Sequence, residues 1–130
     1  MKSSRDYDFS GKSILVADDE ITNFIIIEKT LKKTKIKVFH AENGEQAVQI
    51  FKENPEINLI LMDIRMPEMG GLEATKYIRS VNRETPIIAF TAYALSDDEA
   101  IALEFGCDDY ISKPVRPEFL LKKINEYLNK

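Results

Sequence analysis

Three carboxylates in this chain stand directly after short apolar runs, a position that suits metal or phosphoryl chemistry. Asp18 and Asp19 follow the run Ile14–Ala17. Asp63 follows the run Leu59–Met62. Such runs are typical of buried strands, so each carboxylate marks the point where a strand leaves the core. If the two strands are neighbours in one parallel sheet, the carboxylates meet at its edge. There they repel one another unless a cation or a raised pKa relieves the repulsion, and this indicates a metal site.

Two further polar residues are expected at the same edge. Thr91 directly follows a run predicted as a strand, and Lys113 lies shortly after another. Carboxylates suit a hard, oxygen-binding cation such as Mg²⁺, with Mn²⁺ as an acceptable substitute. Together with Lys113, such a cation can hold the oxygens of a phosphoryl group, whose transfer depends on positioning and charge neutralisation. A carboxylate can itself be the nucleophile and form an acyl phosphate.

Strands and helices alternate along the chain and position these residues. Apolar runs predict strands at about 12–17, 36–40, 57–62, 86–90 and 108–111. Helical periodicity predicts helices at about 23–33, 44–54 and 72–78, and further helices from the capping box at Ser96 to Gly106 and from Pro117 onward. This alternation predicts the α/β class, as a single doubly wound (βα)5 flavodoxin-like domain with a parallel five-stranded sheet and helices on both faces. Such sheets bind ligands outside the carboxyl ends of their strands.

Length and composition fit one globular domain. The 130 residues are 44% hydrophobic and 31% charged, which is ordinary for a protein with a real core. Residues 1–11 are mostly polar and end in Ser10-Gly11. We interpret 1–11 as a tail or linker, with Phe9 docked on the domain, and 12–130 as the domain itself.

Charge, hydropathy and cysteine content argue against several kinds of partner and bear on location. The net charge of −4 argues against direct binding of nucleic acid, which needs a basic face. No apolar stretch approaches the ~20 residues of a membrane helix, and no apolar signal region follows the N-terminus, so this chain itself is not expected to contact a membrane. Cys107 is the single cysteine, which leaves no internal disulfide and favours a cytoplasmic location.

Four motifs resemble those of a known family: Ile14–Glu20, Leu61–Pro67, Ala89–Ala92 and Tyr110–Pro114. In order and spacing they resemble the receiver domain of two-component response regulators, over about residues 12–129. The resemblance implies strand order 2-1-3-4-5, the order of the flavodoxin-like doubly wound folds, which include a chemotaxis receiver. The lead-in Phe9–Lys12 is similar to that of receivers fused to hybrid sensor histidine kinases, so the chain is also interpreted as a possible receiver segment of such a kinase.

The resemblance implies a role for each acidic residue. Asp63 would accept the phosphoryl group. Asp19 and Asp63 would bind Mg²⁺ directly, together with the backbone carbonyl of Arg65, while Asp18 would help through water.

The resemblance also implies roles for the residues around the acceptor. Lys113 would contact the phosphoryl group, and the peptide bond that follows it would be cis. The hydroxyl of Thr91 would hydrogen-bond a phosphoryl oxygen, and Tyr110 would swing inward as Thr91 moves. The amide groups of Arg65 and Ala92 would complete the cradle. Each of these residue types is more often structural when it stands alone, and their coincidence carries the interpretation.

The leading hypothesis is therefore a phospho-acceptor switch in a two-component phosphorelay. A histidine kinase or a histidine phosphotransfer domain would donate to Asp63. The face formed by the fourth helix, the fifth strand and the fifth helix would respond, and is also a possible homodimer contact. Such a module is not an enzyme, although it promotes its own phosphotransfer and dephosphorylation. In a hybrid protein, the full-length chain would be a histidine kinase.

Two alternatives remain open at this point. One is a receiver-like scaffold that is never phosphorylated, although such scaffolds usually lack one of the acidic residues or the lysine. The other is a metal-dependent aspartyl phosphohydrolase, which needs an acid two residues after its nucleophile to protonate the leaving group. After Asp63 that position holds Arg65.

Two large side chains are predicted to tune the lifetime of the acyl phosphate. Arg65 and Tyr93 each lie two residues after a site residue, and both would obstruct the water that attacks in line. His40 is assigned no role. Arg116 stands where relatives often have a helix-capping residue, and Arg cannot accept amide hydrogen bonds.

Overall fold

Five parallel strands form one sheet, as the alternation predicts. The structure is a computed structural model that describes residues 7–66, 69–91 and 98–129. The sheet order is β2-β1-β3-β4-β5, which confirms the doubly wound topology. The strands, all paired in parallel, are β1 (Ser13–Ala17), β2 (Lys37–Ala41), β3 (Leu59–Asp63), β4 (Ile87–Thr91) and β5 (Asp109–Ser112).

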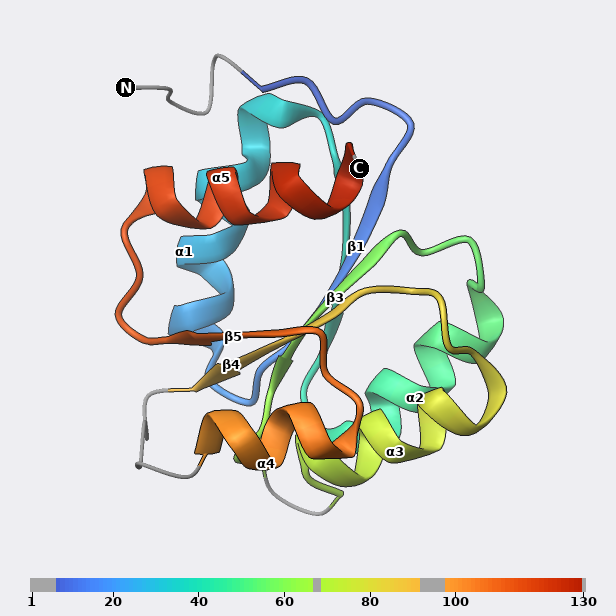
Figure 1. Cartoon of the computed structure of the whole chain (residues 1–130). Helices are drawn as coiled ribbons and strands as arrows, with labels where there is room; N and C mark the ends of the chain where they lie inside the picture. Colours follow the sequence, from blue (N-terminus) through green and yellow to red (C-terminus); the bar gives the residue numbers. More distant parts are fainter. Residues whose placement is uncertain (1–6, 67–68, 92–97, 130) are drawn as a thin grey trace.

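Helices cover both faces of this sheet (Figure 1). They are α1 (Ile21–Leu31), continued by a short 3-10 turn η2 (Lys32–Thr34), α2 (Gly44–Glu53), α3 (Gly71–Val81), α4 (Asp98–Phe105) and α5 (Pro117–Leu128). The first and last helices pack on one face, and α2, α3 and α4 pack on the other. Among the described residues, no helix has both the length and the hydropathy that a membrane span requires.

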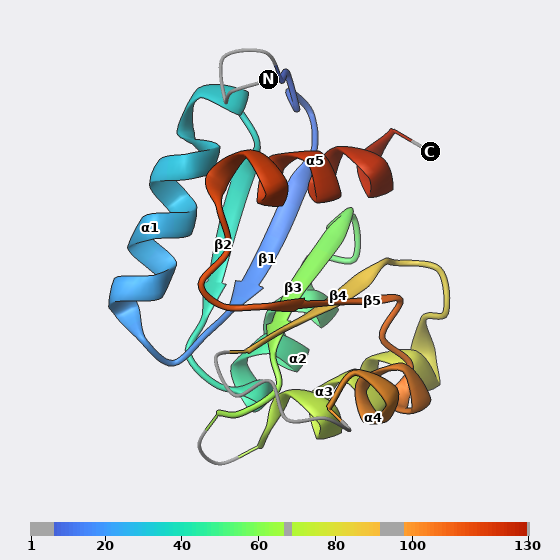
Figure 2. The same cartoon turned by 60° about the vertical axis from the view of Figure 1, so that its left-hand side comes forward.

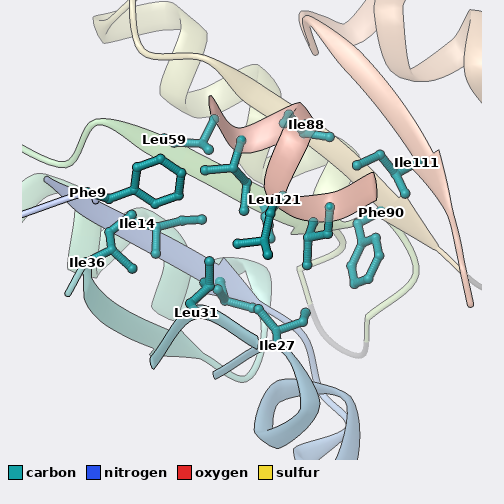
Figure 3. Packing of buried hydrophobic residues seen from close by; sticks show 14 of the residues in the cluster. Phe9, Ile14, Ile27, Leu31, Ile36, Leu59, Ile88, Phe90, Ile111 and Leu121 are labelled. Carbon is teal, nitrogen blue, oxygen red and sulfur yellow. The ribbon is translucent and has the colours of Figure 1, made fainter. Parts of the chain in front are cut away.

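Alternate residues of the central strands pack into two separate hydrophobic cores, one on each face of the sheet. Ile14 and Val16 join the core beneath α1 and α5, whereas Leu15 and Ala17 join the core beneath α2, α3 and α4. Figure 3 shows the first of these cores, in which Leu121 packs among strand residues. Strands β1, β3 and β4 are buried along their whole length, so their polar side chains stand at the first or last residue of a strand.

The segment before β1 is part of the core. Phe9 is 2% exposed, and Tyr7, also buried, lies with its ring centroid 5.6 Å from that of Phe9. The amide of Phe9 donates to the carbonyl of Thr34, the last residue of η2, shortly before β2. The expected docking of Phe9 is confirmed, while the division into a tail (1–11) and a domain (12–130) stays a prediction.

The start of α1 differs from that expected, whereas the end of α4 and the start of α5 agree. Helix α1 begins at Ile21, two residues earlier than its apolar periodicity suggests, and its N-cap makes no side-chain hydrogen bond that a sequence motif could reveal. Gly106 has φ +113, which suits the left-handed end of α4. Arg116 precedes α5 without a capping hydrogen bond, as expected. The predicted helix start at Ser96 lies outside the described residues.

Candidate metal and phosphoryl-acceptor site

The three carboxylates predicted to meet do lie together at the carboxyl edge of the sheet. Asp18 directly follows β1, and Asp63 is the last residue of β3, which pairs with β1. One oxygen from each of Asp18, Asp19 and Asp63 lies within 4.8 Å of the others. Asp18 is 0% exposed and Asp63 is 5% exposed, whereas Asp19 is open to solvent. Two of the three charges are therefore held out of water.

Lys113 bridges the two buried carboxylates. Its Nζ lies 2.6 Å from Oδ2 of Asp18 and 3.2 Å from Oδ2 of Asp63. It follows β5, so its side chain reaches past β4 and lies 4.7 Å from the ring centroid of Phe90. The Lys113–Pro114 peptide bond is cis, as expected. One ammonium group thus partly neutralises a cluster of three carboxylates.

Each buried carboxylate is also fixed by its own loop. Oδ1 of Asp18 accepts a hydrogen bond from the amide of Glu20 (2.9 Å). Oδ1 of Asp63 accepts one from the amide of Arg65 (2.9 Å). In both cases Oδ1 is held by the backbone while Oδ2 faces Lys113. These contacts on both oxygens fix the orientation of the two acidic side chains.

Burial and neighbouring charges shift the pKa of both Asp63 and Lys113. Burial raises the pKa of Asp63, and the Arg65 amide and the Lys113 charge oppose this shift only in part. Burial lowers the pKa of Lys113, but its hydrogen bond with Asp18 and the two carboxylate charges outweigh burial, so its pKa lies above the ordinary value. Lys113 is therefore charged at neutral pH, and carboxylates still outnumber ammonium groups by three to one.

The predicted switch residues lie on the neighbouring strands. Thr91 ends β4 and is fully buried, and its carbonyl accepts a hydrogen bond from the amide of Lys113 (2.8 Å). Tyr110 is half-buried in β5, where it pairs with Ala89. Ala92 and Tyr93 lie outside the described residues. The described geometry thus brings Thr91 and Lys113 to the same edge as the carboxylates.

The chain matches the family model described as the response regulator receiver domain over residues 14–125. It belongs to this family. Receiver domains are phosphoryl-accepting signalling modules of two-component systems.

Receivers similar to this chain occur in two kinds of protein. Hybrid signal transduction histidine kinase I of Dictyostelium discoideum is 38% identical over 127 residues, which cover 92% of this chain but only 7% of that kinase. The polar-differentiation response regulator DivK of Brucella anthropi is 34% identical over 119 residues, which cover 90% of this chain and 96% of DivK. A receiver of this kind is therefore a small part of one relative and almost all of the other.

Two solved structures share the fold of this receiver. The receiver domain of sensor histidine kinase PA1611 from Pseudomonas aeruginosa, with a magnesium ion in its active-site cleft, matches with a TM-score of 0.84 and 34% identity, over 93% of this chain and 100% of that one. The Saccharomyces cerevisiae complex of the phosphotransfer protein Ypd1 and the Ssk1 receiver matches with a TM-score of 0.84 and 36% identity, over 92% of this chain and 90% of that one.

A hard divalent cation fits the donor set of this receiver. The three carboxylates supply oxygen ligands, and the burial of two of them favours a bound charge of opposite sign. Within the described parts of the chain, these are the side chains that gather as a possible metal-binding group.

His40, to which the sequence assigned no role, contacts the backbone of the acidic loop. Its Nε2 lies 3.0 Å from the backbone carbonyl oxygen of Asp18, and its ring stacks on Phe24 with centroids 3.9 Å apart. The available signal was positional: His40 lies near the carboxyl end of β2, which the predicted strand order puts beside β1. His40 therefore buttresses the backbone of the acidic loop.

Proposed function

We propose that this receiver accepts a phosphoryl group on Asp63 in a Mg²⁺-dependent reaction. The observation that carries the proposal is the state of that carboxylate: Oδ1 is held by the Arg65 amide, while Oδ2 faces Lys113 among buried negative charge. In the transfer, the P–N bond of a donor phosphohistidine breaks and a P–O bond to Asp63 forms. The histidine leaves with the electron pair of the broken bond.

The acidic residues would hold the cation. Asp19 and Asp63 would bind Mg²⁺ (or Mn²⁺) directly with the carbonyl of Arg65, and Asp18 would contribute through water. When bound, the cation neutralises charge on the phosphoryl oxygens. The fixed Oδ1 atoms of Asp18 and Asp63 support this assignment, because ligands oriented in advance lose little entropy on binding.

The residues around Asp63 would respond to its phosphorylation. Lys113, which pairs with Asp63 here, would shift toward the phosphoryl oxygens, and the hydroxyl of Thr91 would hydrogen-bond one of them. The amides of Arg65 and Ala92 would complete the cradle, and Tyr110 would follow Thr91 inward. The hydrogen bond from the Lys113 amide to the Thr91 carbonyl supports this coupling of β4 and β5.

The output surface in this proposal is the face of α4, β5 and α5. Leu103 on α4 and Phe119 on α5 are each nearly half exposed, at 45% and 49%. A groove there is lined by Tyr110 and Phe119. These apolar groups fit an effector or a second copy of this domain, which would make the face a homodimer contact.

The donor surface would be the outer side of α1. Ile21 and Ile26 are each 56% exposed, and a cavity of about 420 Å³ between α1 and the segment after Lys113 is lined in part by Ile26 and Leu120. Apolar exposure beside the acceptor fits a histidine kinase or phosphotransfer domain, the kind of protein bound to the Ssk1 receiver.

The wider context belongs to the same proposal. The module acts in the cytoplasm, where its phosphoryl donor has access to ATP, and it is not an enzyme, although it promotes its own phosphorylation and dephosphorylation. The similarity to a hybrid kinase supports a full-length histidine kinase that contains this domain at 12–130.

Phosphorylation by acetyl phosphate tests the proposal. With Mg²⁺ present, intact mass should rise by one phosphoryl group in the wild type and not in Asp63→Ala. A sample that folds and binds Mg²⁺ but gains no mass under conditions that preserve acyl phosphates would favour the unphosphorylated scaffold. Steady turnover of a generic phosphate ester would favour the phosphohydrolase, but Arg65 stands where that reaction needs an acid.

A further inference from the structure

Gly44, the first residue of α2, brings a second helix against the loop that carries the acceptor site. Its amide donates a 2.8 Å hydrogen bond to the carbonyl of Met69. Met69 belongs to the β3–α3 loop, described at 64–66 and 69–70, which also contains Arg65. Helices α2 and α3 lie side by side in both Figure 1 and Figure 2. One hydrogen bond therefore connects α2 to the loop whose Arg65 amide holds Asp63.

The glycine at this position is required by space rather than by backbone conformation. Gly44 is the first residue of a helix, and its φ does not lie in the left-handed region that favours glycine. A Cβ at Gly44 would lie 2.4 Å from the carbonyl oxygen of Met69 and 2.8 Å from that of Gly70. Both atoms belong to the backbone, so the loop itself would have to move.

The far end of the loop leaves little room for such a movement. A Cβ at Gly71 would lie 2.1 Å from the carbonyl oxygen of Asp63 and 2.7 Å from Cα of Ile64, so α3 is already in close contact with the end of β3. Gly70, between these two close contacts, is different, because a Cβ there would meet nothing nearer than 3.6 Å. A displacement at Met69 and Gly70 would therefore be transmitted through Gly71 to Asp63 and Ile64, the residues on which α3 packs.

We propose that Gly44 is a positioning residue for the phosphoryl-acceptor site. By letting the start of α2 approach Met69, it holds the loop where the Arg65 amide meets Oδ1 of Asp63 and where the Arg65 carbonyl can face a bound cation. The proposal rests on the function proposed above. It assigns part of the metal and phosphoryl geometry to a helix that contributes no side chain to the site.

A matched pair of variants, Gly44→Ala and Gly70→Ala, tests the proposal. Mg²⁺ affinity is measured by calorimetry, folding by circular dichroism, and phosphoryl acceptance by intact mass. Gly44→Ala should weaken Mg²⁺ binding by about 10- to 100-fold, the range typical for groups that orient metal ligands. Gly70→Ala should bind Mg²⁺ as the wild type does. A Gly44→Ala protein that melts earlier but binds Mg²⁺ with unchanged affinity would show a merely structural role and overturn the proposal.

A measurement on the wild type decides the case in which Gly44→Ala does not fold. On titration with Mg²⁺, the amide resonance of Gly44 should move together with that of Arg65, while that of Asn129, at the end of α5, stays in place. A fixed Gly44 resonance beside a moving Arg65 resonance would overturn the positioning role alone. A wild type that binds no Mg²⁺ and takes no phosphoryl group would instead refute the proposed function.

Discussion

Buried aromatic side chains lie at the amino ends of β1 and β2, whereas buried charged side chains lie at the carboxyl ends of β1 and β3. Phe9 fills the first position and is 2% exposed. Figure 3 shows it among Ile14, Ile36 and Leu59. At the opposite end, Asp18 and Asp63 are at least as deeply withdrawn from water as Tyr7, yet they face Lys113.

The two ends differ in what burial does to folding. Burying an aromatic ring removes apolar surface from water and stabilises the native state. Burying carboxylates costs solvation, and one shared ammonium compensates only part of that cost. The same strands thus gain stability at one end and hold a strained, charged site at the other. Stability and function should therefore respond to mutation separately, and this separation can be tested.

The largest expected effect is at the amino end. Phe9→Ala should destabilise the protein by about 4 kcal/mol, because it leaves a cavity in a close-packed core. Urea unfolding measures the loss. Mg²⁺ affinity should not change, since Phe9 lies at the opposite end of the strands. Asp8→Ala is the control, because Asp8 is exposed and its loss should leave the urea midpoint nearly unchanged. A Phe9→Ala protein with weakened Mg²⁺ binding would show that the two ends are coupled.

The next effect is at the charged end. Lys113→Ala should cost about 3 kcal/mol in EDTA, because it leaves Asp18 and Asp63 buried without their cation. Saturating Mg²⁺ should restore most of this loss, since the ion binds only the native state. Lys123→Ala is the matched control. Its partner Asp109 is more exposed, and loss of that pair should cost less than about 1 kcal/mol with or without Mg²⁺. Equal losses in the two variants would contradict the charged-end interpretation.

Much of the fold and of the acidic site could be predicted from the sequence, because both depend on local patterns. Buried parallel strands are continuous apolar runs, and the residues after them must share one edge. The meeting of Asp18, Asp63 and Lys113 follows from that rule. Docking of Phe9 could also be predicted, because an aromatic side chain in a mostly polar segment gains stability when it is buried.

What could not be predicted depends on close approach between elements far apart in the chain. No periodicity shows that His40 reaches the carbonyl of Asp18, or that Lys113 divides its ammonium between two carboxylates. The backbones of Gly44 and Met69 lie so close together that a Cβ at Gly44 would be 2.4 Å from the Met69 carbonyl oxygen. Glycine can stand at a helix end for several reasons, so the residue type of Gly44 alone does not reveal the constraint.

A smaller effect concerns pH. Burial raises the pKa of Asp63 above its ordinary value of 3.8. A raised pKa means that the protonated carboxyl favours the native state, so its contribution is complete below pH 3.8 and is lost as pH rises through the folded-state pKa. In EDTA, Asp63→Asn should therefore be more stable than the wild type at pH 7, and the difference should shrink as pH falls toward 3.8. Thermal melts across this range measure it.

Saturating Mg²⁺ supplies the control for the pH experiment. It should stabilise the wild type more than Asp63→Asn and so reduce or reverse their order at pH 7, because the variant lacks one anionic ligand. If the stability difference in EDTA does not change with pH, the buried carboxylate is not the source of the strain.

The smallest effect on stability should come from the side chain of Arg65, although the amide of Arg65 holds Oδ1 of Asp63. The Arg65 side chain is exposed, so Arg65→Asn should leave the melting temperature nearly unchanged. We expect its large side chain to hinder the water that attacks the acyl phosphate, together with Tyr93, which lies outside the described residues. Arg65→Asn and Tyr93→Ala should then each shorten the half-life of the phosphorylated protein in Mg²⁺. Unchanged decay in both variants would show that neither side chain sets the half-life of the acyl phosphate. The half-life would then depend on the backbone and the buried charges at the carboxyl edge of the sheet.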